Sequence, residues 1–329
     1  MRKDTAAGEG KELVIGQSKY LRQAQGMVAC LLLLVSVTAA RPPQKQKLVV
    51  AIQPTFAVAE MLERAKPLEQ FLEQKLGDVD VEVYVPLSQA GVIEALRFGH
   101  AHAAFMGPWA AQLAVEMAGA ELVLAEVREV LIDGKPAQAT YYYSYWIVLP
   151  SSPYHTLAEL RGKRACFPSP VSGSGYVGPL GRLVETKLLN HTEGQEANPQ
   201  QFFGQVLFAG GYGQCWQALQ AGQVDVTVIA GDVPARLYHT VLENSRVLDQ
   251  QGPLPSHAVL VSRELREPLR SRVVEAIAAL GAPEHRPLMR TFISGIFVGF
   301  ERSSAEKHLA AFRRYLDLTG LQFTERIGR

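Results

Sequence analysis

Small hydroxyl-bearing residues and glycines gather between an expected strand and an expected helix, at Ser172, Gly173, Ser174 and Gly175. Backbone N–H groups and serine hydroxyls converge readily in such a segment, and a helix N-terminus adds about half a positive charge, so an oxyanion suits it. The same serines can equally serve only as an N-cap for the helix. The segment is not a P-loop, since Gly-Lys-Ser/Thr is absent, and it lacks the dinucleotide pattern Gly-x-Gly-x-x-Gly.

Three other side chains stand directly after expected strands, where ligands of open α/β sheets bind. Tyr212 lies in a glycine-rich turn, Trp109 follows Gly-Pro, and Thr55 offers a hydroxyl. The alternatives are that Tyr212 packs sideways in a plain turn and that Trp109 only braces the core. On the aromatic strand expected at 139–149, Tyr143 is the tyrosine that we place in the cleft, while Tyr142 and Tyr145 stay open.

Apolar periodicity alternates between strand and helix along the chain, which is typical of an α/β fold with parallel pairs and crossover helices. The expected strands are 47–53, 79–85, 103–106, 139–149, 164–167, 206–209, 224–229 and 258–262. The expected helices are 56–76, 90–99, 108–118, 156–160, 178–189, 214–221, 267–280 and 304–319. Long strands near 143–149 and 254–261 are expected to cross between two lobes that close on a ligand by hinge motion.

The N-terminal region has the order of a secretory signal. The apolar run 27–35 follows Lys19 and Arg22 and ends in small residues, with cleavage expected near Ala39 or Ala40. The run is shorter than the roughly 20 apolar residues that span a bilayer, although a membrane anchor is the alternative. We therefore expect a periplasmic or otherwise extracytoplasmic protein. The expected divisions are a signal peptide at 1–40, a first lobe at 41–145, a second lobe at 146–252 and a return to the first lobe at 253–329.

Composition limits the classes of partner. With 33 Lys and Arg against 32 Asp and Glu, the formal charge is +1, so the chain lacks the basic excess that holds nucleic acid. The three cysteines show no close pairing of the zinc or redox kind, so we expect no metal and no cofactor. In an exported chain, Cys166 and Cys215 can form a disulfide or remain two buried thiols, and both readings stay open.

Several segments resemble, in order and spacing, the substrate-binding proteins of phosphonate, phosphite and phosphate ABC importers. They are Lys66–Gly77, Phe105–Trp109, Leu157–Arg164, Ser172–Pro179 and Ala218–Asp225, within a resemblance that spans 48–318. The resemblance implies a two-lobed type II periplasmic binding protein fold, with a hinge and a ligand cleft between the lobes. It also implies a monomer that hands a small oxyanion, or a related small polar ligand, to an ABC permease in the inner membrane.

The resemblance also assigns residues, with departures. The family's Ser-Thr-Ser-Gly oxyanion loop falls on 172–175 without its threonine, and its histidine falls on Tyr212. The family's acid falls on Ala230, with Asp232 two residues later, where a carboxylate can accept a proton from an oxyanion or pair with an amine. These departures weaken the ligand inference more than the fold inference, and they favour a larger or less charged ligand.

Two other functions compete with import. A protein of the same fold can signal to a membrane histidine kinase. The ligand that it senses would be an oxyanion such as arsenite, for which Cys166 and Cys215 could supply thiols. An enzyme would use Cys166 or Ser174 as nucleophile with a histidine as base. The histidines argue against an enzyme, because His257 is the only one that we expect near the cleft.

Overall fold

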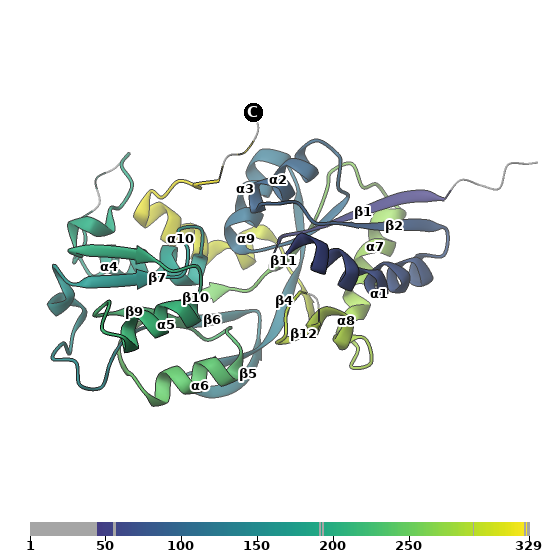
Figure 1. The fold of residues 1–329 in the computed structure, drawn as a ribbon. Helices are drawn as coiled ribbons and strands as arrows, with labels where there is room; N and C mark the ends of the chain where they lie inside the picture. Colours follow the sequence, from purple (N-terminus) through teal and green to yellow (C-terminus); the bar gives the residue numbers. More distant parts are fainter. Residues whose placement is uncertain are drawn as a thin grey trace, which may run out of the picture. The chain divides into compact units, whose positions relative to one another are not determined.

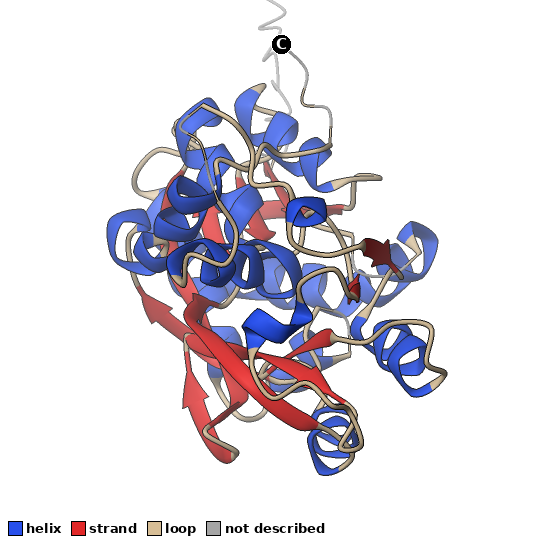
Figure 2. Cartoon of the chain, turned by 90° about the vertical axis from the view of Figure 1, so that its left-hand side faces the viewer, coloured by secondary structure: helices blue, strands red, loops and turns tan. Residues whose placement is uncertain are grey.

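The computed structural model describes residues 45–54, 57–190, 192, 194–291, 293–325 and 327, all within one compact unit that begins at Lys45. The expected signal peptide, 1–40, lies outside the described residues. None of the helices in the described ranges has the length and apolar character needed to cross a bilayer. The described strands form two main bodies, each with helices packed against it (Figures 1 and 2).

The larger body is a sheet with the strand order β12-β4-β11-β3-β1-β2, and β5 pairs with β4. β1 (Gln46–Ile52) pairs in parallel with β2 (Val79–Tyr84) and β3 (Ala103–Met106), as the sequence predicted. The other strands add antiparallel pairs: β11 (Ala258–Val261), β4 (Glu121–Ile132), β12 (Phe297–Arg302) and β5 (Lys135–Ala139). Of these, β4, β5 and β12 were not predicted, so the sheet is mixed.

Strand alternation in the larger sheet supplies two cores, because neighbouring side chains point to opposite faces. Val50 and Val259 pack with one set of helices, whereas Ala51 and Leu260 pack with the other. The first set is α1 (Val58–Leu76), α7 (Leu269–Ala278) and α8 (Arg286–Arg290). The second set is α2 (Gln89–Arg97), α3 (Pro108–Ala118) and α9 (Ala305–His308). The sheet is thus covered on both faces.

The smaller body is built on the antiparallel strands β10 (Arg246–Pro255), β6 (Tyr141–Val148) and β9 (Thr227–Ala230). A bridge between Ala165 and Val226 adds β7 (Arg164–Phe167), which pairs in parallel with β8 (Gln205–Phe208). Its helices are α4 (Gly178–Glu185), α5 (Tyr212–Gln220), α6 (Ala235–Glu243) and α10 (Ala310–Thr319). The helix expected at 178–189 ends four residues early, since Lys187 adopts a φ of 59°.

The described part of the chain passes between the two bodies at four places, the last of them the C-terminal segment, where Glu325 accepts a hydrogen bond from the Ala90 N–H of α2. It leaves β5 for β6 at Thr140, and it leaves β10 for β11 at Ser256 and His257. The single long strand expected at 254–261 is therefore two strands in different sheets. The third passage lies between α9 and α10: Leu309 packs with the core of α2 and α3, while Phe312 packs with the smaller body. The sequence had placed both C-terminal helices with the first lobe.

Candidate functional site

A cavity of about 250 Å³ is lined by residues of both bodies. From the smaller body come Ser172, Ser174, Tyr212 and Asp232, and from the larger come Gln53, Gly107, Trp109 and His257. Most lie just beyond a strand, as expected for ligand sites of α/β sheets. The structure thus brings together six of the predicted site residues: Trp109, Ser172, Gly173, Ser174, Tyr212 and Asp232.

Two predicted residues lie beside the cavity without lining it, and Thr55 lies outside the described residues. Gly175 is needed for close packing, because a Cβ there would lie 2.1 Å from Pro168 Cγ. Tyr143 is replaced in the cavity wall by its neighbour Tyr142, which points to the opposite face of β6.

The segment that holds the serines is a helical turn rather than a loop. Residues Gly173–Val177 form a single π-helical turn that runs into α4, and such turns are frequent at functional sites. Ser172 is its N-cap, with Oγ accepting a hydrogen bond from the Gly175 N–H at 2.9 Å. Ser172 therefore caps the helix, as one of the two interpretations of the serines expected. It also lines the cavity.

Three buried hydroxyls form a connected cluster at the cavity. The Tyr142 hydroxyl donates to Ser174 Oγ at 3.2 Å, and Ser174 Oγ lies 2.8 Å from the Tyr212 hydroxyl. Burial raises the pKa of both tyrosines well above the ordinary value of 10, and the negative charge of Asp232 adds to the shift. Both phenols are therefore neutral at physiological pH. The Tyr142 proton is donated to Ser174, so the Ser174–Tyr212 pair keeps one O–H proton that can be donated to an anion.

A buried charge cluster lies behind these hydroxyls. The Arg128 guanidinium lies 2.8 Å from Glu126 Oε2 and 2.8 Å from Asp232 Oδ2, and its side chain is 5% exposed. Burial opposes the charge on Arg128, but the two carboxylates outweigh it and raise the pKa of the guanidinium. Burial raises the pKa of Asp232, against the lowering effect of Arg128. The single positive charge of Arg128 thus faces two carboxylates. Its charge is already neutralised, so Arg128 does not attract an anionic ligand.

His257 contacts the same cluster from the larger body. Its Nδ1 lies 3.8 Å from Glu126 Oε2, and its Nε2 lies 3.3 Å from the Gln53 amide nitrogen. Burial, followed by the charges of Arg128 and His308, lowers the pKa of His257 well below 6.5, so the ring is neutral at pH 7. The prediction that His257 lies near the cleft is confirmed.

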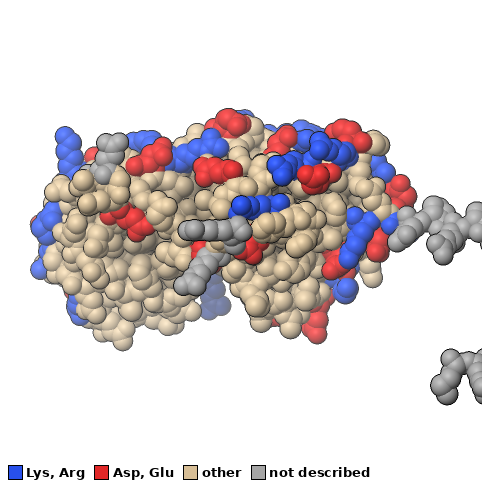
Figure 3. All heavy atoms as spheres, turned by 90° about the horizontal axis from the view of Figure 1, so that it is seen from above, with Lys and Arg blue, Asp and Glu red and all other residues tan. Residues whose placement is uncertain are grey.

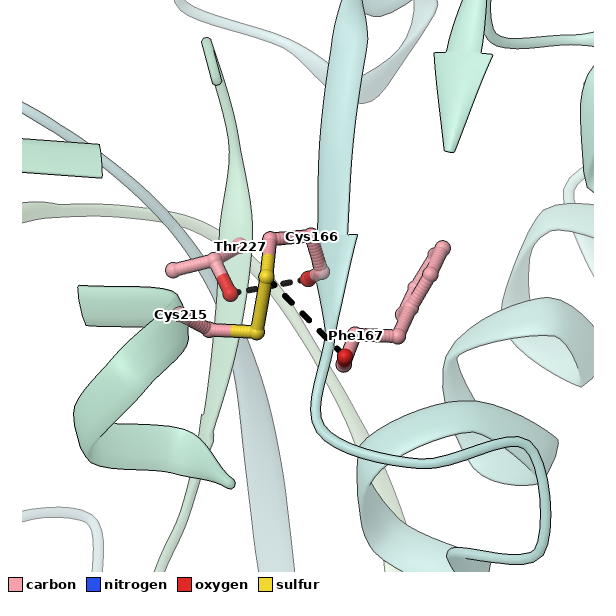
Figure 4. Close-up of a disulfide and its surroundings, with 4 residues drawn as sticks. All are labelled: Cys166, Phe167, Cys215 and Thr227. Carbon is pink, nitrogen blue, oxygen red and sulfur yellow. Dashed lines mark hydrogen bonds between the residues drawn. A yellow bond between two sulfur atoms is a disulfide. The ribbon is translucent and has the colours of Figure 1, made fainter. Parts of the chain in front are cut away.

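A disulfide joins Cys166 of β7 to Cys215 of α5, which decides between the two readings of these cysteines (Figure 4). The Thr227 hydroxyl donates to the Cys166 carbonyl at 2.8 Å and ties β9 to the same point. Both sulfurs are consumed, so neither serves as a nucleophile or as a thiol ligand for arsenite. The bridge lies between the strand that leads to Ser172 and the helix that begins at Tyr212.

The described residues on the face shown in Figure 3 carry no comparable concentration of one charge. In the face shown in Figure 3, Lys and Arg alternate with Asp and Glu. In the part of the chain that the structure describes, no group of three or more His, Cys, Asp or Glu residues is placed to hold a metal ion.

Sequence reasoning left Tyr142 open and missed Gln53, Glu126 and Arg128. A signal for the last two was present, since Glu126 and Arg128 stand two positions apart in the mostly apolar segment of β4 and are buried on the same face of the strand. Charges in a buried strand require partners, and a cation flanked by acids predicts a cluster. Gln53 gave no such signal, because a single amide after a strand is common.

Comparison with known proteins identifies the family to which the chain belongs. The family model for the periplasmic phosphonate substrate-binding protein of ABC transporters matches residues 50–308. The phosphate-import protein PhnD of Mycolicibacterium smegmatis is 30% identical over 160 residues, which are 48% of this chain and 47% of that protein. The matched segments span less than half the length of the curated relatives.

Solved structures agree in fold. A binding protein of an ABC phosphonate transporter from Pseudomonas aeruginosa matches with a TM-score of 0.60 and 20% identity, over 82% of this chain and 85% of the other. PhnD1 from Prochlorococcus marinus, solved with methylphosphonate, matches with a TM-score of 0.59 and 15% identity, over 83% of this chain and 99% of the other. The type II periplasmic binding protein fold predicted from the sequence is thus confirmed. These relatives are named as import and binding proteins. The comparisons therefore give no support to the alternative of a protein that signals to a histidine kinase.

Proposed function

Because this chain belongs to the family of periplasmic substrate-binding proteins of phosphonate ABC transporters, we propose that it binds a small phosphonate, phosphite or phosphate. The bound ligand is then presented to an ABC permease in the inner membrane. The protein performs no chemistry on the ligand, acts as a monomer and reaches the periplasm by the N-terminal signal.

The observation that carries this proposal is the Tyr142–Ser174–Tyr212 hydroxyl cluster beside Asp232 in one cavity. A tetrahedral oxyanion needs several convergent donors, and neutral hydroxyls bind it without a buried cation. The cavity of about 250 Å³ falls near the lower end of small-molecule sites, which run from roughly 300 to 1,000 Å³. This volume favours a small ligand over the larger one that the altered loop suggested.

The charge arrangement narrows the form of the ligand. Arg128 is already neutralised by Glu126 and Asp232, and the cavity lining that the structure describes contains no Lys or Arg. The Asp232 carboxylate repels a fully ionised oxyanion. A ligand that carries an acidic hydrogen or an ammonium group can instead donate a hydrogen bond to this carboxylate. We therefore favour a monoprotonated oxyanion, or an aminoalkylphosphonate whose ammonium group faces Asp232.

The test is a binding panel on protein recovered from the periplasm of cells that express the full chain. Thermal shift and calorimetry compare phosphate, phosphite, methylphosphonate, 2-aminoethylphosphonate, arsenate, sulfate and several amino acids. Ligand at 100 times its dissociation constant adds about 2.7 kcal/mol of stability. We expect a phosphorus oxyanion to bind, and Asp232→Asn to weaken protonated or amino-bearing ligands most. Binding of amino acids with no response to any oxyanion would contradict the proposal.

A further inference from the structure

A short chain of polar contacts lies in the larger body behind the cavity, and it begins at the Gly107 backbone. The Gly107 N–H donates to Gln53 Oε1 at 2.6 Å. A backbone N–H can only donate, so this contact identifies the oxygen of the Gln53 amide and leaves the –NH₂ group at the other position. Gln53 is 8% exposed and lines the cavity, so its amide orientation decides what the ligand meets there.

The Gln53 –NH₂ group in turn determines the tautomer of His257. Gln53 Nε2 lies 3.3 Å from His257 Nε2, and the amide nitrogen can only donate. The ring Nε2 must therefore accept, which places the ring proton on Nδ1. Nδ1 lies 3.8 Å from Glu126 Oε2, too far for a hydrogen bond, but the negative charge of this carboxylate favours a proton on the nearer ring nitrogen.

We propose that neutral His257, held in its Nδ1–H form by Glu126, is a positioning residue that fixes the Gln53 amide and presents its second N–H to an oxygen of the ligand. This inference rests on the proposed function for the nature of the ligand, but the tautomer and the amide orientation do not depend on it. Gln53 becomes a specificity-determining donor from the larger body, opposite the hydroxyls of the smaller body. Among the described residues, no hydrogen bond occupies that second N–H.

The groups around His257 keep it in the required state. Glu126 and Arg128 face it from β4, and His308 faces it from α9, where His308 Nε2 lies 3.0 Å from the Ser256 carbonyl. Burial and the positive charge of Arg128 lower the pKa of His257, so the neutral form dominates at neutral pH. A protonated ring would direct an N–H at the Gln53 –NH₂ group, and two donors facing each other would turn the amide away.

Close packing around Gln53 and His257 restricts the orientation of the Gln53 amide. A Cβ built at Gly107 would lie 3.3 Å from Gln53 Oε1 and 3.6 Å from His257 Nε2, so both groups pack against this glycine. The same three residues all line the cavity. A glycine at this position therefore permits the backbone N–H to approach the amide oxygen closely.

The first experiment needs no ligand. Long-range ¹H–¹⁵N correlation spectra of the ¹⁵N-labelled protein report the tautomer of each histidine, and the spectrum of His257→Gln identifies the resonances of His257. We expect the Nδ1–H form at about pH 7.5, although free histidine favours Nε2–H. A Nε2–H ring or a protonated ring would overturn the inference, whatever the protein binds.

The second experiment measures methylphosphonate affinity by calorimetry. His257→Phe removes the acceptor for Gln53 and is expected to weaken binding about five- to tenfold, the loss typical of one hydrogen bond. His257→Gln offers an acceptor near the position of Nε2 and should restore most of that loss. His155→Phe, at an exposed histidine away from the cavity, is the matched control.

A double-mutant cycle separates positioning from a general structural role. In a Gln53→Leu background, His257→Phe should have almost no further effect, because the amide that it orients is gone. Additive losses would overturn the inference. If the wild-type protein bound neither methylphosphonate nor phosphate, the proposed function would fail, and the tautomer spectrum would still decide the positioning claim.

Discussion

Ser174 Oγ lies 2.8 Å from the Tyr212 hydroxyl, although the two residues are 38 positions apart and follow different strands. Tyr142 donates to the same Ser174 oxygen, so the Ser174 proton is free to be given to Tyr212. Either hydroxyl of this pair can donate to the other, and when Ser174 donates, the Tyr212 O–H is left to donate to a ligand. Two strand–helix junctions are in this way coupled into one donor site for a ligand.

Tyr212→Phe removes this terminal donor while keeping the ring. We expect about a two- to tenfold loss of oxyanion affinity by calorimetry, the range for one neutral hydrogen bond. The free energy of unfolding of the ligand-free protein should change little. Tyr176→Phe is a matched control, because Tyr176 is a buried tyrosine of the same body that does not line the cavity. Equal effects of the two substitutions would argue against a ligand role for Tyr212.

Arg128→Met leaves Glu126 and Asp232 buried without their shared cation. Breaking a buried ion pair on one side costs about 3–5 kcal/mol, and we expect a loss of that size in urea unfolding at neutral pH. The deficit should shrink at about pH 5, because protonation of a carboxylate relieves the repulsion. Arg302→Met, which removes an exposed ion pair with Glu275, should cost less than about 1 kcal/mol. A deficit independent of pH would contradict this account of the cluster.

The lowered pKa of His257 predicts how stability depends on pH. Between the folded pKa and 6.5, the unfolded chain binds more protons than the folded chain, so stability falls as the pH drops through that window. His308 is shifted in the same direction by burial. We expect constant stability above about pH 7 and a decline below about pH 6.5. His257→Gln should make the decline shallower, and an unchanged slope would show that His257 is not neutral in the fold.

The Cys166–Cys215 disulfide closes a loop across a separation of 49 residues. On the chain-entropy model, a loop of this length stabilises the fold by up to about 4 kcal/mol. We expect the Cys166→Ala, Cys215→Ala double variant to lose about 2–4 kcal/mol in urea unfolding and to bind ligand more weakly. Thiol counting in denaturant without reductant supplies the direct check: titration of both cysteines as free thiols would contradict the bridge.

The sequence was sufficient for the parts of the fold with strong local patterns. β1, α1, β2 and α3 were predicted within about one or two residues, because apolar periodicity, Pro at a helix start and Gly at a helix end are local signals. β4 and β12 were not predicted, since their antiparallel pairing depends on contacts with strands that are distant in sequence. The serine turn, Tyr212 and Asp232 were found through strand–helix junctions and family resemblance. Gln53 was not found, and the choice between Tyr142 and Tyr143 stayed open, because these roles depend on which way neighbouring side chains point.

The third passage of the chain runs from Leu309, which follows α9, to Phe312 of α10, and it attaches the two bodies at one more point than the two passages between strands. Trp109 of α3 and Phe312, with ring centroids 6.3 Å apart, meet at this attachment and at the cavity wall. The aromatic contact that shapes the site is therefore also part of the attachment between the two bodies, and we expect any hinge motion of the bodies to change the cavity wall at Trp109 and Phe312.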